Sequence, residues 1–297
     1  MVTGGLVRSR LVRTRLVRLL TALLLLCSFH GVAATPPRLV VLAPHLVEQL
    51  YNIDAGKMIV GTVEHADYPA AASKIPRVGN YAGLQLERIL ALKPDLVLYW
   101  QSGSPAADIS RLQSLGIRTE AFEAKTLDDI ASDLLRLGEL TGRQPLATLR
   151  AAEFRQRLAQ LRQQYQQQSA VTVFYELWDE PLSTIGPDAW PMQALTLCGG
   201  KNIFADARSA YPQVSAEALL QRQPQLILQP ASATEARRLT DFPQRFASLR
   251  AVQLKQLAKP DADLLHRATL RTLDGVTELC QMLAKSRAFY AGLGASR

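Results

Sequence analysis

Residues 81–98 read YAGLQLERILALKPDLVL and residues 211–228 read YPQVSAEALLQRQPQLIL, so one pattern recurs at an offset of 130 residues. In each copy a tyrosine precedes a short amphipathic helix, a glutamate lies in its first turn, and a proline precedes an apolar strand. The matched pairs are Tyr81 and Tyr211, Glu87 and Glu217, and Pro94 and Pro224. The alternative is ordinary reuse of a helix–strand unit. The ungapped match instead favours two similar lobes with a binding cleft between them.

The first 34 residues have the composition of a secretory signal peptide. Five arginines and no acid lie between Arg8 and Arg18, and an apolar stretch follows from Leu19 to Phe29. That stretch is short for a membrane span. Small residues end at Ala34, where we expect cleavage, and we therefore expect a periplasmic protein. An uncleaved N-terminal anchor is the alternative, and the sequence leaves lipid anchoring open.

The composition of the remaining chain argues against nucleic-acid binding and catalysis. Without the five arginines the formal net charge falls from +8 to +3, and no basic run remains. P-loop, Gly-x-Ser-x-Gly and His-Glu-x-x-His motifs are absent, so we predict no catalytic residues. An exported hydrolase with an unfamiliar site is the alternative.

The histidines do not suggest a metal-ion binder. His45, His65 and His266 are scattered, whereas a zinc or manganese site needs several converging ligands. We therefore predict no metal site in the protein itself. His65, near Tyr68, is the best candidate to ligate the metal of a bound chelate, against the simpler interpretation of a solvated loop histidine.

Two cysteines remain after Ala34, namely Cys198 and Cys280. In an oxidising compartment such a pair predicts a disulfide. Closing a loop of about 80 residues would contribute roughly 4 kcal/mol to stability. Two buried free thiols are the alternative.

Apolar strands alternate with helical stretches, which indicates an α/β fold with mostly parallel sheets flanked by helices. Residues 144–168 contain one early proline and then good helix formers, which predicts one long rigid helix connecting the lobes. A crossover helix within one lobe is the alternative. We expect a signal peptide at 1–34, an N-terminal lobe at 35–143, this helix, and a C-terminal lobe at 169–297. We also expect a helix near Glu235, a strand at 252–257, and a final helix at 269–290.

Several segments resemble the periplasmic vitamin B12-binding proteins of ABC importers, within the wider metal-chelate and siderophore binding group. They are Asp67-Tyr68-Pro69, LERILALKPDLV at 86–97, CGGKNIF at 198–204, YPQVS at 211–215, and Asp263 to Arg267. The resemblance covers nearly the whole chain after Ala34. It implies two lobes joined by a rigid helix, with cobalamin held between them as a ligand and not as a cofactor. A haem or ferric-siderophore binder is the alternative.

The resemblance also implies roles for particular residues. Tyr68, Tyr81, Trp100 and Tyr211 match aromatic ligand-contact positions, and Asp263 and Arg267 match polar ones. Two of the aromatic positions, Tyr81 and Tyr211, are tryptophan in a close relative within the family. The segment from Tyr175 to Pro181 matches poorly, so Trp178 is only a plausible further wall.

Glu87 and Glu217 match acids that meet arginines on the two halves of an inner-membrane permease dimer. Helix capping alone would also explain an acid at each position. The resemblance therefore implies a monomer with two partners, the ligand and the ABC transporter.

Overall fold

The computed structural model describes residues 35–232 and 242–295. The expected signal peptide and the expected helix near Glu235 lie outside these residues. Both lobes belong to the unit that begins at Pro37. None of the helices in the described ranges has the length and apolar character needed to cross a membrane.

The first lobe is built on a parallel four-stranded sheet in the order β2-β1-β5-β6. Its strands are β1 (Leu39–Val41), β2 (Ile59–Thr62), β5 (Leu96–Trp100) and β6 (Thr119–Phe122). Its helices are α2 (Pro44–Asn52), α3 (Leu86–Ala91), α4 (Ala106–Ser114) and α5 (Leu127–Thr141), with short 3₁₀ turns at Gly56–Met58 and Ala70–Lys74. A small hairpin, β3 (Gly79–Asn80) and β4 (Gly83–Leu84), precedes α3. The strands of the main sheet are largely buried, as expected for a parallel sheet covered on both faces.

The second lobe repeats this topology. Its parallel sheet has the order β10-β9-β7-β8, so in both lobes the first strand in sequence lies between the second and the third. Its strands are β7 (Val171–Tyr175), β8 (Gly200–Asn202), β9 (Leu226–Leu228) and β10 (Leu257–Ala258). Its helices are α7 (Met192–Leu197), α8 (Ala216–Arg222), α9 (Phe242–Arg245), α10 (Arg250–Gln253), α11 (Ala262–Leu265) and α12 (Thr272–Ala295). The repeated sequence forms α3–β5 in one lobe and α8–β9 in the other.

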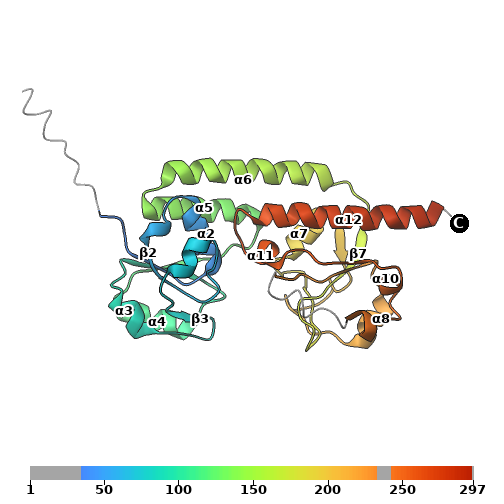
Figure 1. The fold of residues 1–297 in the computed structure, drawn as a ribbon, viewed down its shortest axis with the longest axis horizontal. Helices are drawn as coiled ribbons and strands as arrows, with labels where there is room; N and C mark the ends of the chain where they lie inside the picture. The colour runs from blue at the N-terminus through green and yellow to red at the C-terminus, as the bar shows by residue number, and fades with distance from the viewer. Residues whose placement is uncertain (1–34, 233–241, 296–297) are drawn as a thin grey trace, which may run out of the picture. The chain divides into compact units, whose positions relative to one another are not determined.

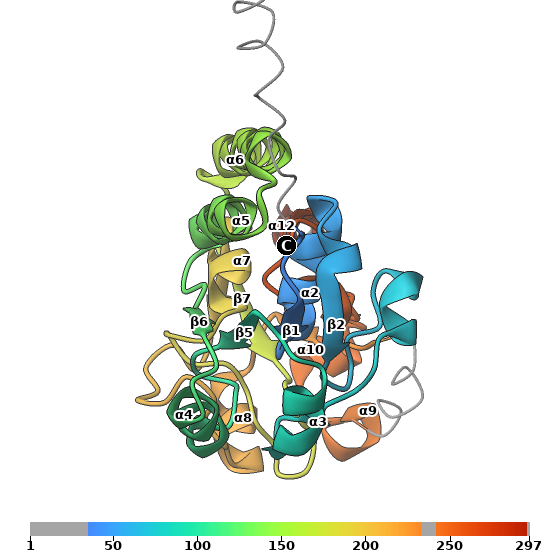
Figure 2. The same ribbon diagram turned by 90° about the vertical axis from the view of Figure 1, so that its left-hand side faces the viewer.

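The long connecting helix is α6 (Gln144–Tyr165), which packs mainly against α5. Figure 1 shows α5, α6 and α12 along one side of the two lobes, with α3, α4 and α8 on the opposite side, and Figure 2 agrees. The buried face of α6 is formed by Ala147, Ala151, Phe154, Leu158 and Leu161. Leu149, on another face of the helix, is 52% exposed. The small alanines on the buried face allow α6 to lie close to its neighbours.

Helix α5 begins with a capping box. The Thr126 hydroxyl accepts a hydrogen bond from the Asp129 amide, and the Asp129 carboxylate accepts one from the Thr126 amide. The helix ends at Gly142, whose φ of 68° suits a left-handed C-terminal cap. This turn reverses the chain so that α6 packs antiparallel on α5.

One expected strand is wrong. The sequence predicts a strand at residues 252–257, but α10 covers the first two of them and β10 begins only at Leu257. Short apolar runs do not distinguish a strand from a buried turn of helix. Here Ala251 and Leu249 pack into the core, and Lys255 adopts a left-handed conformation (φ 55°) that ends the helical turn.

A single hydrophobic core runs through both lobes. It contains residues of β1, α2 and α5 from the first lobe, the inner face of α6, and residues of β7, α7 and α12 from the second. Smaller clusters fill the outer face of each sheet. The lobes therefore have separate sheets but share one interior.

Candidate ligand-binding site

A cavity of about 970 Å³ lies between the lobes. Its lining includes residues at the carboxyl ends of strands from both lobes. In the first lobe, His45 follows β1, Trp100 ends β5 and Glu123 follows β6. In the second lobe, Leu177 follows β7. Ligands in open α/β sheets bind beyond the carboxyl ends of the strands, which is where this cavity lies. Its volume is within the range of small-molecule sites, about 300–1,000 Å³.

Two of the four predicted aromatic contacts line this cavity, one from each lobe. Trp100 ends β5 in the first lobe, and Tyr211 lies in the loop before α8 in the second lobe. The two side chains are 41% and 51% exposed, respectively. Such exposure leaves their flat faces available to a ligand, and aromatic faces supply large contact area at low side-chain entropy cost.

The other predicted aromatic residues lie outside the lining of this cavity. Tyr81 is 81% exposed in the β3–β4 turn, and Trp178 is 53% exposed. Tyr68 carries the guanidinium of Arg271 over its ring at 3.6 Å from the centroid, a cation–π contact between the lobes. His65 is exposed in the same loop as Tyr68, with φ of 64°.

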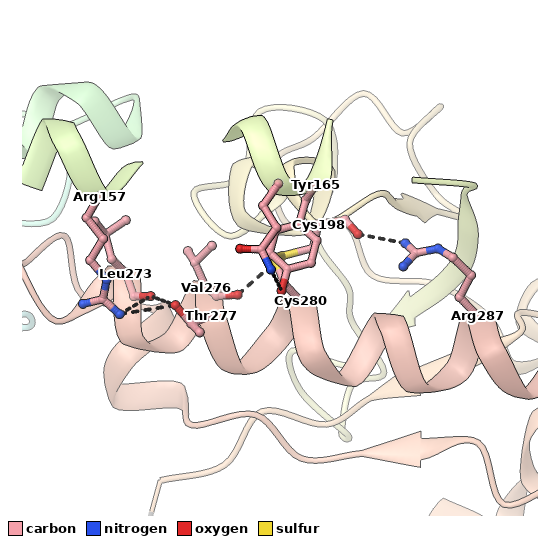
Figure 3. Close-up of a disulfide and its surroundings, with 9 residues drawn as sticks. Arg157, Tyr165, Cys198, Leu273, Val276, Thr277, Cys280 and Arg287 are labelled. Atoms are coloured by element: carbon pink, nitrogen blue, oxygen red, sulfur yellow. Dashed lines mark hydrogen bonds between the residues drawn. A yellow bond between two sulfur atoms is a disulfide. The ribbon is translucent and has the colours of Figure 1, made fainter. Parts of the chain in front are cut away.

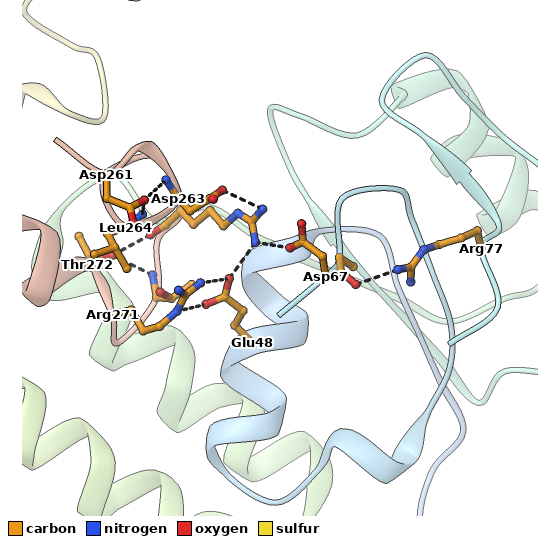
Figure 4. Close-up of polar contacts among 11 residues, drawn as sticks. Glu48, Asp67, Arg77, Asp261, Asp263, Leu264, Arg271 and Thr272 are labelled. Carbon is orange, nitrogen blue, oxygen red and sulfur yellow. Dashed lines mark hydrogen bonds and ion pairs between the residues drawn. The ribbon is translucent and has the colours of Figure 1, made fainter. Parts of the chain in front are cut away.

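Asp263 and Arg267 belong to an ionic network that joins the lobes (Figure 4). Arg267 contacts Glu48 of α2 at 3.1 Å, Asp67 at 2.8 Å and Asp263 at 3.1 Å. Arg271 also donates to both carboxylate oxygens of Glu48, at 2.9 and 2.8 Å. Partial burial raises the pKa of Asp67, but the hydrogen bond and charge of Arg267 outweigh it and lower the pKa overall.

Glu48 is 1% exposed in this network, so its charge is compensated by two arginines from the other lobe. A buried carboxylate is tolerated only when paired and hydrogen-bonded in this way. The network therefore fixes one edge of the interface between the lobes.

Gln193 of α7 clamps the lobes a second time. Its side-chain oxygen accepts from the Leu127 amide at 2.9 Å, and its amide nitrogen donates to the Lys125 carbonyl. Gln193 and Lys125 both line the cavity. The cavity thus lies next to a backbone segment of the first lobe, Lys125 to Leu127, that is hydrogen-bonded to a side chain of the second lobe.

Comparison with protein families identifies the fold. A model for periplasmic binding proteins matches residues 39–263. The chain belongs to the periplasmic binding protein family. Within residues 35–232 and 242–295, no group of His, Cys, Asp or Glu side chains gathers to hold a metal ion.

Two relatives that are similar in sequence to this binding protein are both described as vitamin B12-binding proteins. A vitamin B12-binding protein of Vibrio cholerae is 39% identical over 246 residues, covering 83% of this chain and 88% of the relative. One of Photorhabdus laumondii subsp. laumondii is 34% identical over 265 residues, covering 89% and 94%.

Solved structures show the same architecture. The periplasmic vitamin B12 binding protein BtuF of Vibrio cholerae superposes with a TM-score of 0.78 at 37% identity, covering 85% of this chain and 98% of that one. The periplasmic heme-binding protein RhuT of Roseiflexus sp. RS-1 superposes with a TM-score of 0.75 at 20% identity, covering 85% and 100%, and therefore shares the fold. Both resemble the two-lobed arrangement expected from the repeat.

Three cavity residues of this binding protein escaped the sequence analysis as site residues. Trp190 donates from its indole to the Leu265 carbonyl at 2.9 Å, and His266 shares a 2.9 Å hydrogen bond with the hydroxyl of Tyr175. Burial raises the pKa of Tyr175, so that hydroxyl keeps its proton. The third is His45, in the first turn of α2. Burial, together with the charge of Arg267, lowers its pKa to about 4. Helix and loop positions in the sequence did not indicate that these rings face one cavity.

The predicted disulfide is confirmed. Cys198, directly after α7, is bonded to Cys280 in the middle of α12 (Figure 3). Both residues are fully buried. Arg287, further along α12, donates to the carbonyls of Cys198 and Ser169 at 3.0 and 2.6 Å. These contacts tie the last helix to the second lobe beside the shared core.

Glu87 and Glu217 are both exposed in the first turns of α3 and α8. Hydrogen bonds from its own backbone and from Ser215 lower the pKa of Glu217, so this acid is ionised at neutral pH. Figures 1 and 2 show α3 and α8 on the same side, one helix in each lobe, opposite α6. Each lobe therefore carries one of these acids in the first turn of a helix on that side.

Proposed function

We propose that this protein captures vitamin B12 between its lobes in the periplasm and delivers it to an ABC importer. The observation that carries the proposal is a cavity between two topologically matched lobes with an aromatic wall from each, Trp100 and Tyr211. Cobalamin presents a broad apolar corrin with a fringe of amides. Flat rings suit the corrin, and polar cavity residues such as Ser102 and Gln193 suit amides.

Tyr68, Tyr81, Asp263 and Arg267 remain proposed ligand contacts. Arg267 and Tyr68 lie at the ionic network beside His266, which lines the cavity. Our proposal is that they border the cavity and meet the parts of a large ligand that extend beyond it. Arg267 would then serve the ligand and the lobe interface together.

Delivery would use the two exposed acids. We propose that Glu87 and Glu217 of the monomeric protein pair with arginines on the two halves of the permease dimer. Processing after Ala34 would release the protein into the periplasm. Its role would be binding and not catalysis.

Calorimetric titration of residues 35–297 tests the choice of ligand. Cyanocobalamin should bind at one site, with no chemical change on prolonged incubation. Haem and a ferric siderophore, the alternative ligands, should bind more weakly. Tighter binding of either one than of cyanocobalamin would contradict the proposal.

A further inference from the structure

His45 occupies an unusual position in the wall of the cavity. Its ring is 9% exposed, it lines the cavity, and the indole of Trp100 packs edge-on against it with the ring centroids 5.7 Å apart. No described residue makes a hydrogen bond to either ring nitrogen of His45. The other cavity imidazole, His266, has its Nε2 engaged by Tyr175. His45 therefore differs from a histidine that a polar partner holds within the core.

The imidazole of His45 is also held neutral. Burial disfavours its charged form, and the first turn of α2 places it at the positive end of a helix. A neutral imidazole keeps a lone pair and is a common ligand for transition metals. An imidazole nitrogen without a protein partner in the wall of a cavity is available to a bound group.

We propose that His45 coordinates the cobalt of bound cobalamin at the axial position that water occupies in aquocobalamin. The inference rests on the proposed function, because it requires cobalamin in this cavity. A bond forms from the imidazole nitrogen to cobalt, the bond from cobalt to water breaks, and water leaves. Cobalt remains trivalent, and no proton or electron is transferred.

This coordination distinguishes forms of cobalamin. Water is a weakly held axial ligand that imidazole can displace, whereas cyanide in cyanocobalamin is held firmly. The Trp100 indole packs against the imidazole at an interplanar angle of 89° and so positions the ring as well as forming a wall. The protein therefore favours aquocobalamin over cyanocobalamin, in addition to its contacts with the corrin.

The test is the absorption spectrum of each cobalamin bound to the processed protein, together with its dissociation constant. Binding of aquocobalamin should change the corrin spectrum to match that produced by free imidazole, and the spectrum of cyanocobalamin should show no such change. Aquocobalamin should bind more tightly than cyanocobalamin, because the imidazole can replace only the weakly held axial water. In His45→Ala, both the spectral change and the preference for aquocobalamin should disappear, and a far-ultraviolet circular dichroism spectrum matching that of the parent protein would show that the variant is folded.

The matched control is His65→Ala, since His65 is exposed and outside the cavity lining. It should behave as the parent protein does. Cyanocobalamin binding without any spectral change for aquocobalamin would overturn the inference and leave the proposed function intact. A spectral change that persists in His45→Ala, or is lost in His65→Ala, would overturn the assignment to His45. Failure of both cobalamins to bind would overturn the proposed function and the inference together.

Discussion

The two lobes share a sheet topology but differ where their third strands end. In the first lobe β5 ends with exposed Trp100, which lines the cavity. In the second lobe β9 is followed by Gln229, which is 1% exposed and donates to the Glu176 carboxylate at 2.6 Å. One sheet thus presents an aromatic ring and the other buries a carboxylate–amide pair. Matched apolar positions determine the framework, and unmatched strand ends determine the binding surface.

The helices of the repeat differ as well. Ser215 caps α8 by accepting from the Ala218 amide at 3.1 Å, whereas α3 has no side-chain cap and follows the β3–β4 hairpin. The acids of these helices nevertheless occupy corresponding first turns. The matching positions of Glu87 and Glu217 therefore do not depend on the two helices being capped in the same way.

The largest effect is expected for the double variant Glu87→Ala with Glu217→Ala. If both lobes dock on the permease through these acids, uptake of cobalamin should be abolished while affinity for cobalamin is unchanged, because such charge pairs govern encounter and orientation. Uptake by cells and calorimetry with purified protein measure the two quantities. Glu139→Ala, an exposed acid on α5, is the control. Normal uptake by the double variant would show that both acids serve only to cap their helices.

The disulfide distinguishes the second lobe from the first. Replacing Cys198 and Cys280 together by alanine should lower the free energy of unfolding by about 2–4 kcal/mol, because the crosslink closes a loop of 82 residues in the unfolded chain. Denaturant unfolding of both proteins measures the loss. Two alkylatable thiols in folded protein isolated from the periplasm would contradict the pairing.

The cavity walls are compared by Trp100→Ala and Tyr211→Ala. Each should weaken cobalamin binding by about 1–3 kcal/mol, with the larger effect at the larger ring. Calorimetry measures both, and Trp178→Ala, outside the cavity lining, should change affinity less. If neither cavity variant differs from the parent protein, the cavity is not the binding site.

The buried pair in the second lobe predicts a smaller, pH-dependent effect. Burial raises the pKa of Glu176 from 4.5 to about 7, against the opposing hydrogen bond from Gln229. The folded protein thus holds this proton more tightly than the unfolded chain, and stability falls as pH rises from about 4.5 to about 7. Asp133 contributes in the same direction, because burial and the charge of Asp129 raise its pKa to about 6.

Glu176→Gln isolates this contribution, since glutamine retains a partner for Gln229 and does not titrate. The loss of stability between pH 5 and pH 8 should be smaller in the variant by on the order of 1–2 kcal/mol. Chemical unfolding of both proteins across this range measures the difference. Parallel stability curves for the two proteins would show that Glu176 is ionised in the fold.

The sequence predicted the framework better than the binding surface. Matched residues such as Pro94 and Pro224 indicated the helix–strand units, because the pattern lies within a short segment of sequence. The cysteine pair indicated the disulfide, because only two cysteines remain after Ala34. Trp190 and His266 gave no such signal, because loops bring them to the cavity through tertiary packing. The pairing of Arg267 with Glu48 joins residues 219 positions apart, which no spacing rule reveals.

The shared core has a consequence for how the chain folds during export. It joins Leu39, near the start of β1, to Leu283 on α12, so its first and last members are separated by almost the whole folded sequence. A chain emerging with its N-terminus first would carry an incomplete interior until α12 had also emerged. Contacts between distant residues slow folding and prolong the exposure of apolar surface. The first lobe would therefore depend on the last helix to emerge, and would need protection from aggregation until that helix arrived.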